Sequence, residues 1–486
     1  MTNQMVLQSS MKTRKVIIAG GGLGGLATAA LLAKAGFSVT LYEKTQTIGG
    51  RAVCKKIGDY WLDSGFHSLR KADKGPAAVV LEKIGKPIEF ATKYSEGVVP
   101  KTYDKGKLAD SPLSVSQLLL RYPLLSFMQK MRMMMLIWKI KKTPIEKLDQ
   151  MTIAKLLTTS KINDKNIISH LKQMISIAYY CEPDLEKISA GELARYLADW
   201  PYDVGFPKGG WKQLIDKLQE AILENGGAIR IGKDVRSIWI TEEETGGSVL
   251  GGSPGAVNMA KAAGVVFQDG SKEEADFVVL NTPLKEIPDL LEKKYLSQEL
   301  SQLLDNNDDI QTSAAVVMDI AVNQQIIRGK PDSIITLDPC TILRVNSKYD
   351  SNIAPHGYHL LSAWMPIDSI RSKNRDYVDN KFKELEQIIH QVFFENFKND
   401  SVRPIRKMVF RTAIGFYPSP SMTRSKRPGI IFPSVTNLYL VGDSTNAEGI
   451  GGSSDIAFNS AIECHNAITS KEIELTAQCI APKAFI

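Results

Sequence analysis

The sequence predicts an α/β protein: a Rossmann-like, doubly wound parallel sheet built from separated segments, with an α+β domain inserted between them. A glycine-rich turn lies near each end of the 486-residue chain, and each turn follows a short apolar strand. Between the two turns, residues 112–199 have an almost wholly helical pattern. The apolar runs after residue 314 are typical of an antiparallel sheet.

The composition is that of an ordinary folded protein. Hydrophobic residues make up 43% of the chain and charged residues 23%, which excludes a disordered or fibrous chain. The 60 basic and 53 acidic residues leave a net charge of +7, a small excess for this length. We therefore expect no nucleic-acid partner, because dedicated nucleic-acid binders are far more basic.

The cysteines and the N-terminal residues predict the compartment. The cysteines are scattered, without a Cys-x-x-Cys pair, which favours a reducing, cytoplasmic setting with no disulfide framework and no metal site. The first ten residues are polar and lack the apolar core of a secretory signal. No run reaches about 18 uncharged apolar residues, so we expect no transmembrane helix.

The first predicted unit is strand, turn, helix, strand. Residues 15–19 are a short β-branched run, and residues 28–35 have the Ala/Leu content of a helix that Gly36 ends. Residues 37–42 alternate as a second strand. A βαβ unit of this kind implies parallel strands.

The turn inside this unit has GxGxxG spacing on Gly20, Gly22 and Gly25. Gly20 allows the tight exit from the strand, Gly22 lets the backbone approach a diphosphate, and Gly25 lets the helix pack on the sheet. The diphosphate would lie at the helix N-terminus, where free N–H groups favour anions. Glu43 ends the second strand and is placed to accept a hydrogen bond from a ribose hydroxyl. The unit therefore predicts dinucleotide binding.

A second glycine pair, Gly49 and Gly50, follows shortly and is joined to Arg51. The glycines expose backbone amides, and the arginine supplies a fixed cation near the same helix end, which suits a further contact to the diphosphate or to a flavin. The alternative is an ordinary turn with a surface arginine.

Residues 20–25, Glu43 and residues 49–51 together resemble the FAD-binding region of the flavin amine oxidase and phytoene desaturase superfamily. Carotenoid desaturases, retinol saturases and protoporphyrinogen oxidases are similar. The resemblance implies FAD as the cofactor and an oxidoreductase activity.

The resemblance continues at residues 207–211 and 232–238 and ends at residues 440–443 and 448–453. It implies that Val235 runs beside the adenine, that Asp443 binds the ribityl chain or the diphosphate, and that the last turn aims a helix N-terminus at the flavin pyrimidine. The implied cofactor-binding residues are Gly20, Gly22, Leu23, Gly24, Gly25, Glu43, Lys44, Gly50, Arg51, Val235, Gly442, Asp443, Gly451, Gly452 and Ser453.

Two residues are candidates for catalysis. His67 follows Gly65 where the family chain runs close to the flavin, and it would act as a general base or a polar ligand, unless a turn simply satisfies it. Asp455 would transfer a proton or would be an ordinary acidic residue at a helix N-terminus. The last glycine turn looks more like the desaturase version, and the sequence shows no aromatic pair beside it of the kind that amine oxidases of this family use.

Residues 118–142 are apolar and basic. They predict either a buried substrate-domain helix with a rim of long basic side chains or a helix that docks on a membrane surface. Tyr179 and Tyr180 are expected to fill the core or to line the substrate pocket.

We expect residues 14–90, 206–290 and 405–470 to form the FAD-binding domain. Residues 91–205 and 291–404 would form the substrate domain, and residues beyond Lys471 a tail.

The predicted function is FAD-dependent dehydrogenation or hydrogenation of a carbon–carbon bond in a small lipophilic, isoprenoid-like substrate. The alternatives are oxidation of an amine at its C–N bond and flavin binding without turnover. The sequence leaves the substrate, the direction of the reaction, the electron acceptor and the oligomeric state open.

Overall fold

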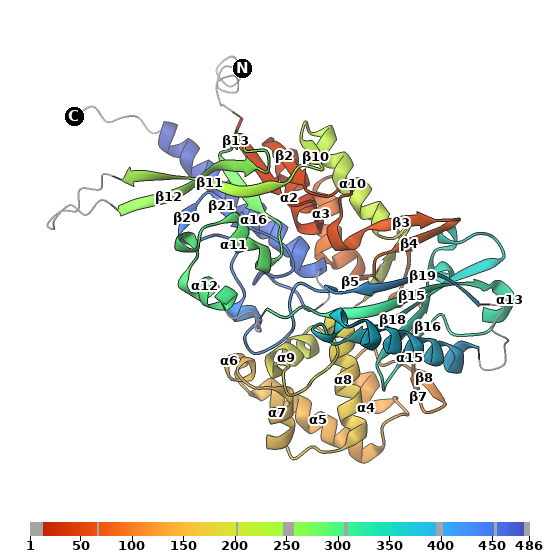
Figure 1. The fold of residues 1–486 in the computed structure, drawn as a ribbon. Helices are drawn as coiled ribbons and strands as arrows, with labels where there is room; N and C mark the ends of the chain where they lie inside the picture. Colours follow the sequence, from red (N-terminus) through yellow and green to blue (C-terminus); the bar gives the residue numbers. More distant parts are fainter. Residues whose placement is uncertain are drawn as a thin grey trace, which may run out of the picture.

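The computed structural model describes residues 13–65, 68–200, 203–245, 257–305, 310–394, 402–451 and 454–480. A parallel sheet with its helices lies at one end of the molecule, a group of helices lies at the other, and a large mixed sheet lies beside them (Figure 1). None of the helices in the described ranges has the length and apolar content needed to cross a membrane.

Five parallel strands form the first sheet, and their order is β10-β2-β1-β14-β21. The three inner strands are nearly continuous apolar runs, as expected when both faces of a parallel sheet are covered. Their bounds are β1 (Lys15–Ala19), β2 (Ser38–Glu43), β10 (Ala228–Ile231), β14 (Phe277–Leu280) and β21 (Leu438–Leu440).

Helices cover one face of this sheet, and a second sheet covers the other. The covering helices are α2 (Leu23–Lys34), α10 (Trp211–Glu224) and α16 (Ser454–Ile480). The second sheet is antiparallel apart from one short parallel pair, and its strands are β11 (Val235–Thr245), β12 (Val257–Phe267), β13 (Lys272–Glu274) and β20 (Val435–Thr436). The predicted Rossmann-like α/β fold is confirmed, with an antiparallel sheet where a doubly wound fold usually has helices on its second face.

The last helix is longer than the sequence indicated. α16 continues to Ile480, so the expectation of a tail directly beyond Lys471 is wrong. Two polar contacts hold this part of the helix: Arg14 pairs with Glu472 at 3.1 Å, and Lys471 donates a hydrogen bond to the Asn437 side chain at 2.5 Å.

A seven-stranded sheet of order β19-β15-β18-β17-β16-β7-β8 forms the second body of the fold. All its neighbours are antiparallel except β16 and β7. The strands are β7 (Lys101–Asp104), β8 (Lys107–Asp110), β15 (Ala314–Asn323), β16 (Ser333–Thr336), β17 (Thr341–Val345), β18 (Tyr358–Ile367) and β19 (Val402–Phe410). The antiparallel pattern predicted after residue 314 is therefore found.

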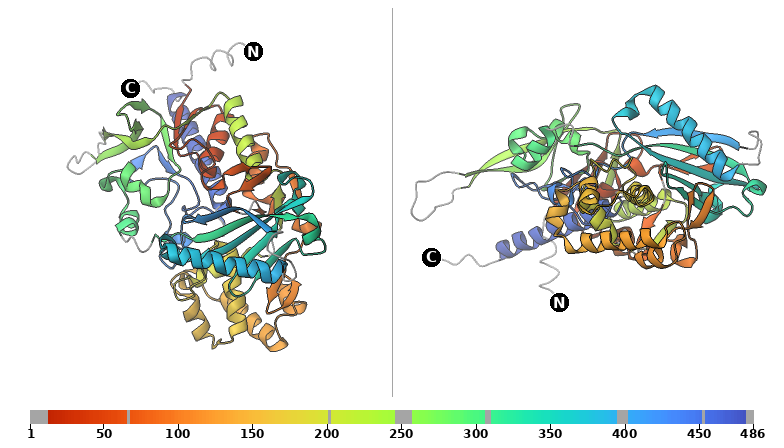
Figure 2. Two further views of the ribbon diagram at one scale, coloured as in Figure 1. Left: turned by 45° about the vertical axis from the view of Figure 1, so that its right-hand side comes forward. Right: turned by 90° about the horizontal axis from the view of Figure 1, so that it is seen from below.

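The period of two along these strands sends alternate side chains to opposite faces. Val316 and Ala363 pack toward α15 (Arg375–Phe393), which crosses the outer face of the sheet (Figure 2). Val317 and Trp364 point to the inner face, where this cluster packs against Ile177 of α8 (Lys165–Tyr179) and against Tyr180.

Six helices follow one another between residues 115 and 198, as the pattern of residues 112–199 predicts. They are α4 (Val115–Leu120), α5 (Phe127–Lys142), α6 (Ile145–Asp149), α7 (Ile153–Thr159), α8 (Lys165–Tyr179) and α9 (Ala190–Ala198).

Shorter elements connect these bodies. They are β3 (Cys54–Ile57), β4 (Tyr60–Asp63), β5 (Leu69–Arg70), β6 (Phe90–Lys93), β9 (Val204–Pro207), α3 (Pro76–Lys83), α11 (Ile287–Leu290), α12 (Gln298–Asp305), α13 (Gln324–Ile327) and α14 (Asn346–Tyr349). The predicted domain boundary at residue 405 falls inside β19, which is hydrogen-bonded to β15 of the seven-stranded sheet.

Candidate cofactor and active site

A groove of about 870 Å³ opens where the parallel strands end. Ligands bind at this edge in α/β folds, because the loops that follow adjacent strands converge there. The walls come from the turns after β1, β2, β14 and β21, and from β18 and β19 of the seven-stranded sheet. The volume lies in the usual range for small-molecule sites.

The first glycine turn forms the floor of this groove. Gly20 has a φ of 110°, in the left-handed region that favours glycine, and its N–H donates to the Tyr42 carbonyl at 2.8 Å. Gly22 is the N-cap of α2, so the free N–H groups of the first helical turn face the groove side. A Cβ atom on Gly25 would lie 2.1 Å from the Gly20 carbonyl oxygen. The glycine spacing thus permits the close helix–strand packing that the sequence predicts.

Glu43 ends β2, is buried, and lines the groove. Its two carboxylate oxygens accept hydrogen bonds from the backbone N–H groups of Gly21 and Thr45, both at 2.8 Å. The carboxylate therefore holds the glycine turn and keeps lone pairs free for a hydroxyl. The neighbouring Lys44 pairs with Glu286 at 2.8 Å at the exposed rim.

Arg51 and Asp443 join the two ends of the chain across the groove. The Arg51 Nη2 atom lies 2.6 Å from Asp443 Oδ1, and the Gly415 N–H donates to Asp443 Oδ2 at 2.8 Å. Burial acts to raise the pKa of Asp443, but the Arg51 guanidinium and the donor N–H groups outweigh it and hold this pKa below its usual value. Asp443 is therefore a buried, charged acceptor in the groove wall.

Asn281 is a groove residue that sequence reasoning missed. It directly follows β14, its N–H donates to the Ala19 carbonyl at 2.8 Å, and its side-chain amide donates to the Val441 carbonyl at 3.0 Å. Asn281 thus connects the first glycine turn to the turn at Gly442 that follows β21. The sequence held one signal for this role: Asn281 directly follows an apolar run, residues 277–280, that predicts a buried strand.

Three aromatic side chains form a wall at one end of the groove. Tyr180 and Trp364 have ring centroids 5.4 Å apart at 65°, and Trp364 and Phe410 are stacked at 5.4 Å and 29°. Gly65 lies against this wall, since a Cβ atom there would be 3.6 Å from the Trp364 ring. Sequence reasoning named Tyr180 as one candidate for lining the pocket but missed Trp364 and Phe410, because these two lie on strands far along the chain from the C-cap of α8.

The adjacent side chains of Tyr179 and Tyr180 point to different parts of the molecule. Tyr180 has a φ of 44°, a left-handed conformation that is uncommon outside glycine and often occurs at functional sites. Its ring lines the groove. Tyr179 is fully buried in the core, where its hydroxyl donates to Glu192 Oε2 at 2.6 Å.

The other predicted site residues fall into three groups. Leu23, Gly24, Gly50, Val235 and Gly442 line the groove. Gly451 instead packs against the end of α8, where a Cβ atom would lie 1.6 Å from the Ala178 carbonyl oxygen. His67, Gly452 and Ser453 lie outside the described residues. The cofactor-binding roles of all these residues stay predictions.

Asp455 is buried at the start of α16 and does not line the groove. Burial raises its pKa to about 6, against the lowering effect of Arg70 and Lys71, while Asp199 acts to raise it further. This environment suits a carboxyl group that exchanges a proton near neutral pH, but the side chain lies behind the groove wall.

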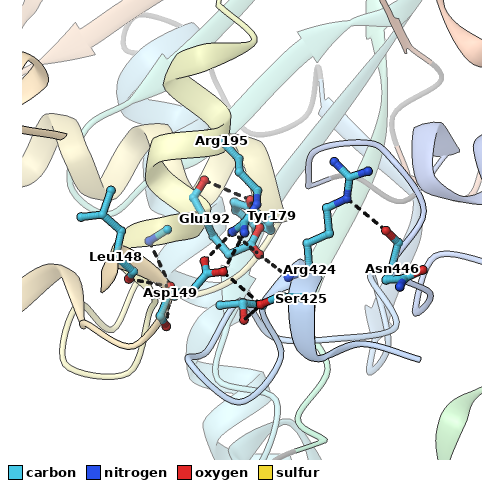
Figure 3. Close-up of polar contacts among 11 residues, drawn as sticks. Leu148, Asp149, Tyr179, Glu192, Arg195, Arg424, Ser425 and Asn446 are labelled. Atoms are coloured by element: carbon cyan, nitrogen blue, oxygen red, sulfur yellow. Dashed lines mark hydrogen bonds and ion pairs between the residues drawn. The ribbon is translucent and has the colours of Figure 1, made fainter. Parts of the chain in front are cut away.

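A buried polar cluster connects the helices to the segment that leads to Asp443 (Figure 3). Arg195 of α9 makes a bidentate contact with Asp149, at 2.6 and 2.8 Å, and contacts Glu192 at 3.3 Å. Glu192 in turn accepts from the backbone N–H of Arg424 at 3.1 Å, and Asp149 from Ser425 at 3.1 Å. The cluster thereby fixes helices α6 and α9 relative to the segment that leads to Gly442 and Asp443.

The groove fits a flavin dinucleotide. The glycine turn leaves space beside a helix N-terminus for a diphosphate, and Arg51 supplies a cation. Among the described residues, the buried indole N–H of Trp211, which lines the groove, has no hydrogen-bond partner. An acceptor on a bound ligand would satisfy this donor.

Comparison with known proteins agrees with this geometry. The chain is 22% identical to a 4,4'-diaponeurosporene oxygenase of Staphylococcus haemolyticus over 95% of this chain and 100% of the relative. Its fold is similar to an oxidoreductase of Methanosarcina mazei (TM-score 0.71, 21% identity, 93% of this chain and 100% of that one). It is also similar to putrescine oxidase bound to putrescine (TM-score 0.66, 14% identity, 94% and 99%).

A family profile described as flavin-containing amine oxidoreductase matches residues 23–468. This range includes the first glycine turn from Leu23 onward, Arg51, the aromatic wall and Asp443. Membership of the family implies FAD as the cofactor. The chain belongs to the flavin-containing amine oxidoreductase family and is an oxidoreductase distantly related to carotenoid desaturases.

Proposed function

We propose that the protein uses FAD to remove hydrogen from, or add it to, a carbon–carbon bond of a lipophilic, isoprenoid-like substrate. The observation that carries this proposal is the wall of Tyr180, Trp364 and Phe410. A bound flavin supplies the hydride acceptor or donor, so the protein has to hold the substrate carbon in place and exclude water.

The polar residues of the groove suit the dinucleotide rather than the substrate. The acidic lining residues are Glu43, Asp234, Glu286 and Asp443. Glu43 holds the glycine turn, Glu286 pairs with Lys44, and Asp443 pairs with Arg51. In this proposal Arg51 and the first turn of α2 hold the diphosphate, and Asp443 accepts from the ribityl hydroxyls.

The aromatic wall suits an extended hydrocarbon. Its rings offer apolar area and π faces, which also favour positive charge that develops on a neighbouring carbon. The Staphylococcus haemolyticus relative, named for a carotenoid, supports this substrate class.

Anaerobic reduction of the flavin tests the proposal. Holoenzyme is mixed with phytoene or squalene in detergent micelles, and the visible flavin absorbance is followed. We expect bleaching with at least one of these hydrocarbons, and loss of bleaching in Trp364→Ala while the flavin is retained. Trp239→Ala on β11 is the matched control and should behave as the wild type. Absence of reduction by both compounds would count against dehydrogenation of a hydrocarbon; for hydrogenation, the corresponding result is that neither compound reoxidises a flavin reduced beforehand with dithionite.

Amine oxidation is the second candidate, and one structural feature favours it. A neighbouring cavity of about 530 Å³ shares Thr312 with the groove, and its charged lining is five acidic residues and three lysines: Glu182, Asp184, Glu186, Asp338, Asp368, Lys172, Lys187 and Lys381. Burial raises the pKa of Glu182. The excess of acidic over basic side chains would favour a cationic amine, although the raised pKa of Glu182 weakens its own share of the negative charge. Peroxide formation under air with putrescine and other amines would support this candidate over the first, and a flavin that neither class reduces would support binding without turnover.

A further inference from the structure

We propose that the outer face of α5 docks the protein on the surface of a membrane that contains anionic lipids. This face consists of six exposed side chains: Phe127, Met128, Met131, Met134, Met135 and Trp138. The inference concerns a partner and does not depend on the substrate proposed above.

The spacing of these residues puts them on one side of the helix. They recur at intervals of three and four residues, whereas Met133, Leu136, Ile137 and Ile140 form the opposite, buried side. α5 is therefore apolar on both sides, although only one of them packs on the protein. This combination is unusual for a surface helix, whose outer side is normally polar.

The exposure of this face is large. Phe127 is 74%, Met135 66% and Trp138 64% exposed, and Leu120 at the end of α4 is 80% exposed. Seven of the fourteen large exposed apolar side chains in the described part of the chain lie between residues 120 and 138. A contiguous apolar patch of this kind marks an interaction site.

The charges around the patch identify the partner. Residues 111–145 contain no Asp or Glu, and their basic residues are Arg121, Lys130, Arg132, Lys139, Lys141 and Lys142. Apolar side chains with an aromatic residue, flanked by lysine and arginine, are the composition that lies in the interface of an anionic bilayer. A second copy of the chain is disfavoured as the partner, because a symmetric contact would bring the same cations together.

The position of α5 relates the patch to the groove. α5 lies in the group of helices at the end of the molecule away from the parallel sheet (Figure 1). The Gln129 side chain donates to Asp164, the N-cap of α8, at 3.1 and 3.2 Å. Tyr180, at the other end of α8, lines the groove. The 15 residues of α8 span about 22 Å, so one rigid helix connects the docking face to the site.

Vesicle sedimentation with the full-length holoenzyme tests the proposal. Vesicles of phosphatidylglycerol and phosphatidylcholine are compared with vesicles of phosphatidylcholine alone. We expect binding to the anionic vesicles and weaker binding to the neutral ones. The double variant Met135→Ser/Trp138→Ser should bind at least about tenfold more weakly, as should Lys141→Glu/Lys142→Glu.

Matched controls keep the same chemistry at other exposed positions. Leu223→Ser/Ile431→Ser removes two exposed apolar side chains, and Lys373→Glu/Lys383→Glu reverses two exposed lysines. Both should bind as the wild type. Quenching of Trp138 by brominated acyl chains gives an independent readout, and Trp138→Phe should remove most of it.

Three results would overturn the proposal. The first is no binding to anionic vesicles. The second is equal binding by the α5 variants and their controls. The third is a concentration-dependent dimer that Met135→Ser/Trp138→Ser abolishes, because a second copy would then cover the face.

Discussion

At Gly22, the absence of a side chain is expected to be essential for retaining the cofactor. Its φ of −73° suits any residue, so substitution leaves the backbone unstrained. A Cβ atom there would lie 2.7 Å from Asn281 Oδ1, on the groove side of the turn. We expect Gly22→Val to fold and to lose FAD, because the branched side chain fills the space for the diphosphate.

The measurement is the ratio of flavin absorbance to protein in purified Gly22→Val, together with its circular dichroism spectrum. Gly429→Val is the control, since the nearest atom to a Cβ atom at that position is 3.9 Å away. Full flavin occupancy in Gly22→Val would argue against the diphosphate position.

Asp455 should make the stability of the apoprotein depend on pH. Burial raises its pKa to about 6, whereas an unfolded aspartate titrates near ~3.9. Between these values the folded state binds more protons than the unfolded state, so the free energy of unfolding falls as pH rises. A pKa difference of roughly two units corresponds to about 3 kcal/mol in the free energy of unfolding, and this stability is fully lost above about pH 7.

Asp455→Asn should therefore be more stable than the wild type at pH 7.5, and the advantage should vanish at pH 4. Urea unfolding across this range measures the effect, with Asp379→Asn on the exposed side of α15 as the control. A pH-independent difference between Asp455→Asn and the wild type would contradict the buried-carboxyl account.

Sequence reasoning located single residues well where a local motif surrounds them. Gly20, Gly22 and Glu43 lie within one strand–turn–helix–strand unit, so their spacing predicted that they would meet at the groove. Arg51 lies just beyond this unit, and its motif left a surface arginine open as the alternative. Trp364 and Phe410 carry no local signal, because only the register of β15 with β18 and β19 brings them to the inner face of the sheet.

The contact between α9 and the segment before β20 is a structural requirement for the site. Asp149 and Glu192 are buried, and Arg195 is the cation that contacts both. We expect Arg195→Met to lower the free energy of unfolding by about 3–5 kcal/mol, because it leaves two buried carboxylates without that partner.

Chemical denaturation of the holoenzyme and of Arg195→Met measures this loss. Lys293→Met is the control, since Lys293 pairs with Asp305 at 2.7 Å on the exposed surface. Such a pair contributes roughly 1 kcal/mol or less. Similar losses for the two variants would mean that the buried cluster adds no more than a surface ion pair.

The helix α5 explains why residues 118–142 allowed two interpretations. A pattern that is apolar on both sides of a helix predicts a fully buried helix as readily as a membrane-surface helix. The fold buries one side, with Leu136 and Ile137, and exposes the other, with Met135 and Trp138. Periodicity gives the two sides but not which of them meets the protein, because that depends on contacts with α8 and α9 far along the chain.

The molecule as a whole brings three distant segments to one groove. Gly24 lies beside Gly442, since a Cβ atom on Gly24 would be 3.1 Å from the Gly442 nitrogen. Asn281, from the middle of the chain, lies between them. The two glycine turns allowed the sequence to predict that the chain ends meet. Which residues of the seven-stranded sheet line the groove was not predictable, because no local motif encodes the register of its strands.

This arrangement makes the dinucleotide a long ligand with separable halves. Glu43 and Val235 lie where the adenosine half is expected, and Arg51 and Asp443 lie where the diphosphate and ribityl chain are expected. In Glu43→Gln the side-chain NH2 group must face one of the two backbone N–H donors, Gly21 or Thr45. The adenosine end of the groove and the Gly21 part of the glycine turn are thereby disturbed, whereas Arg51 and Asp443 keep their contact.

We therefore expect Glu43→Gln to weaken FAD binding by roughly 10- to 150-fold, since a hydrogen bond to a charged group contributes about 1.5–3 kcal/mol. Binding of FMN, which lacks the adenosine, should be weakened much less than binding of FAD. Titration of the apoprotein with each flavin measures this, and Glu286→Gln at the exposed rim is the control. Equal losses for FAD and FMN would place Glu43 away from the adenosine half, and the direction of the dinucleotide along the groove would have to be reversed.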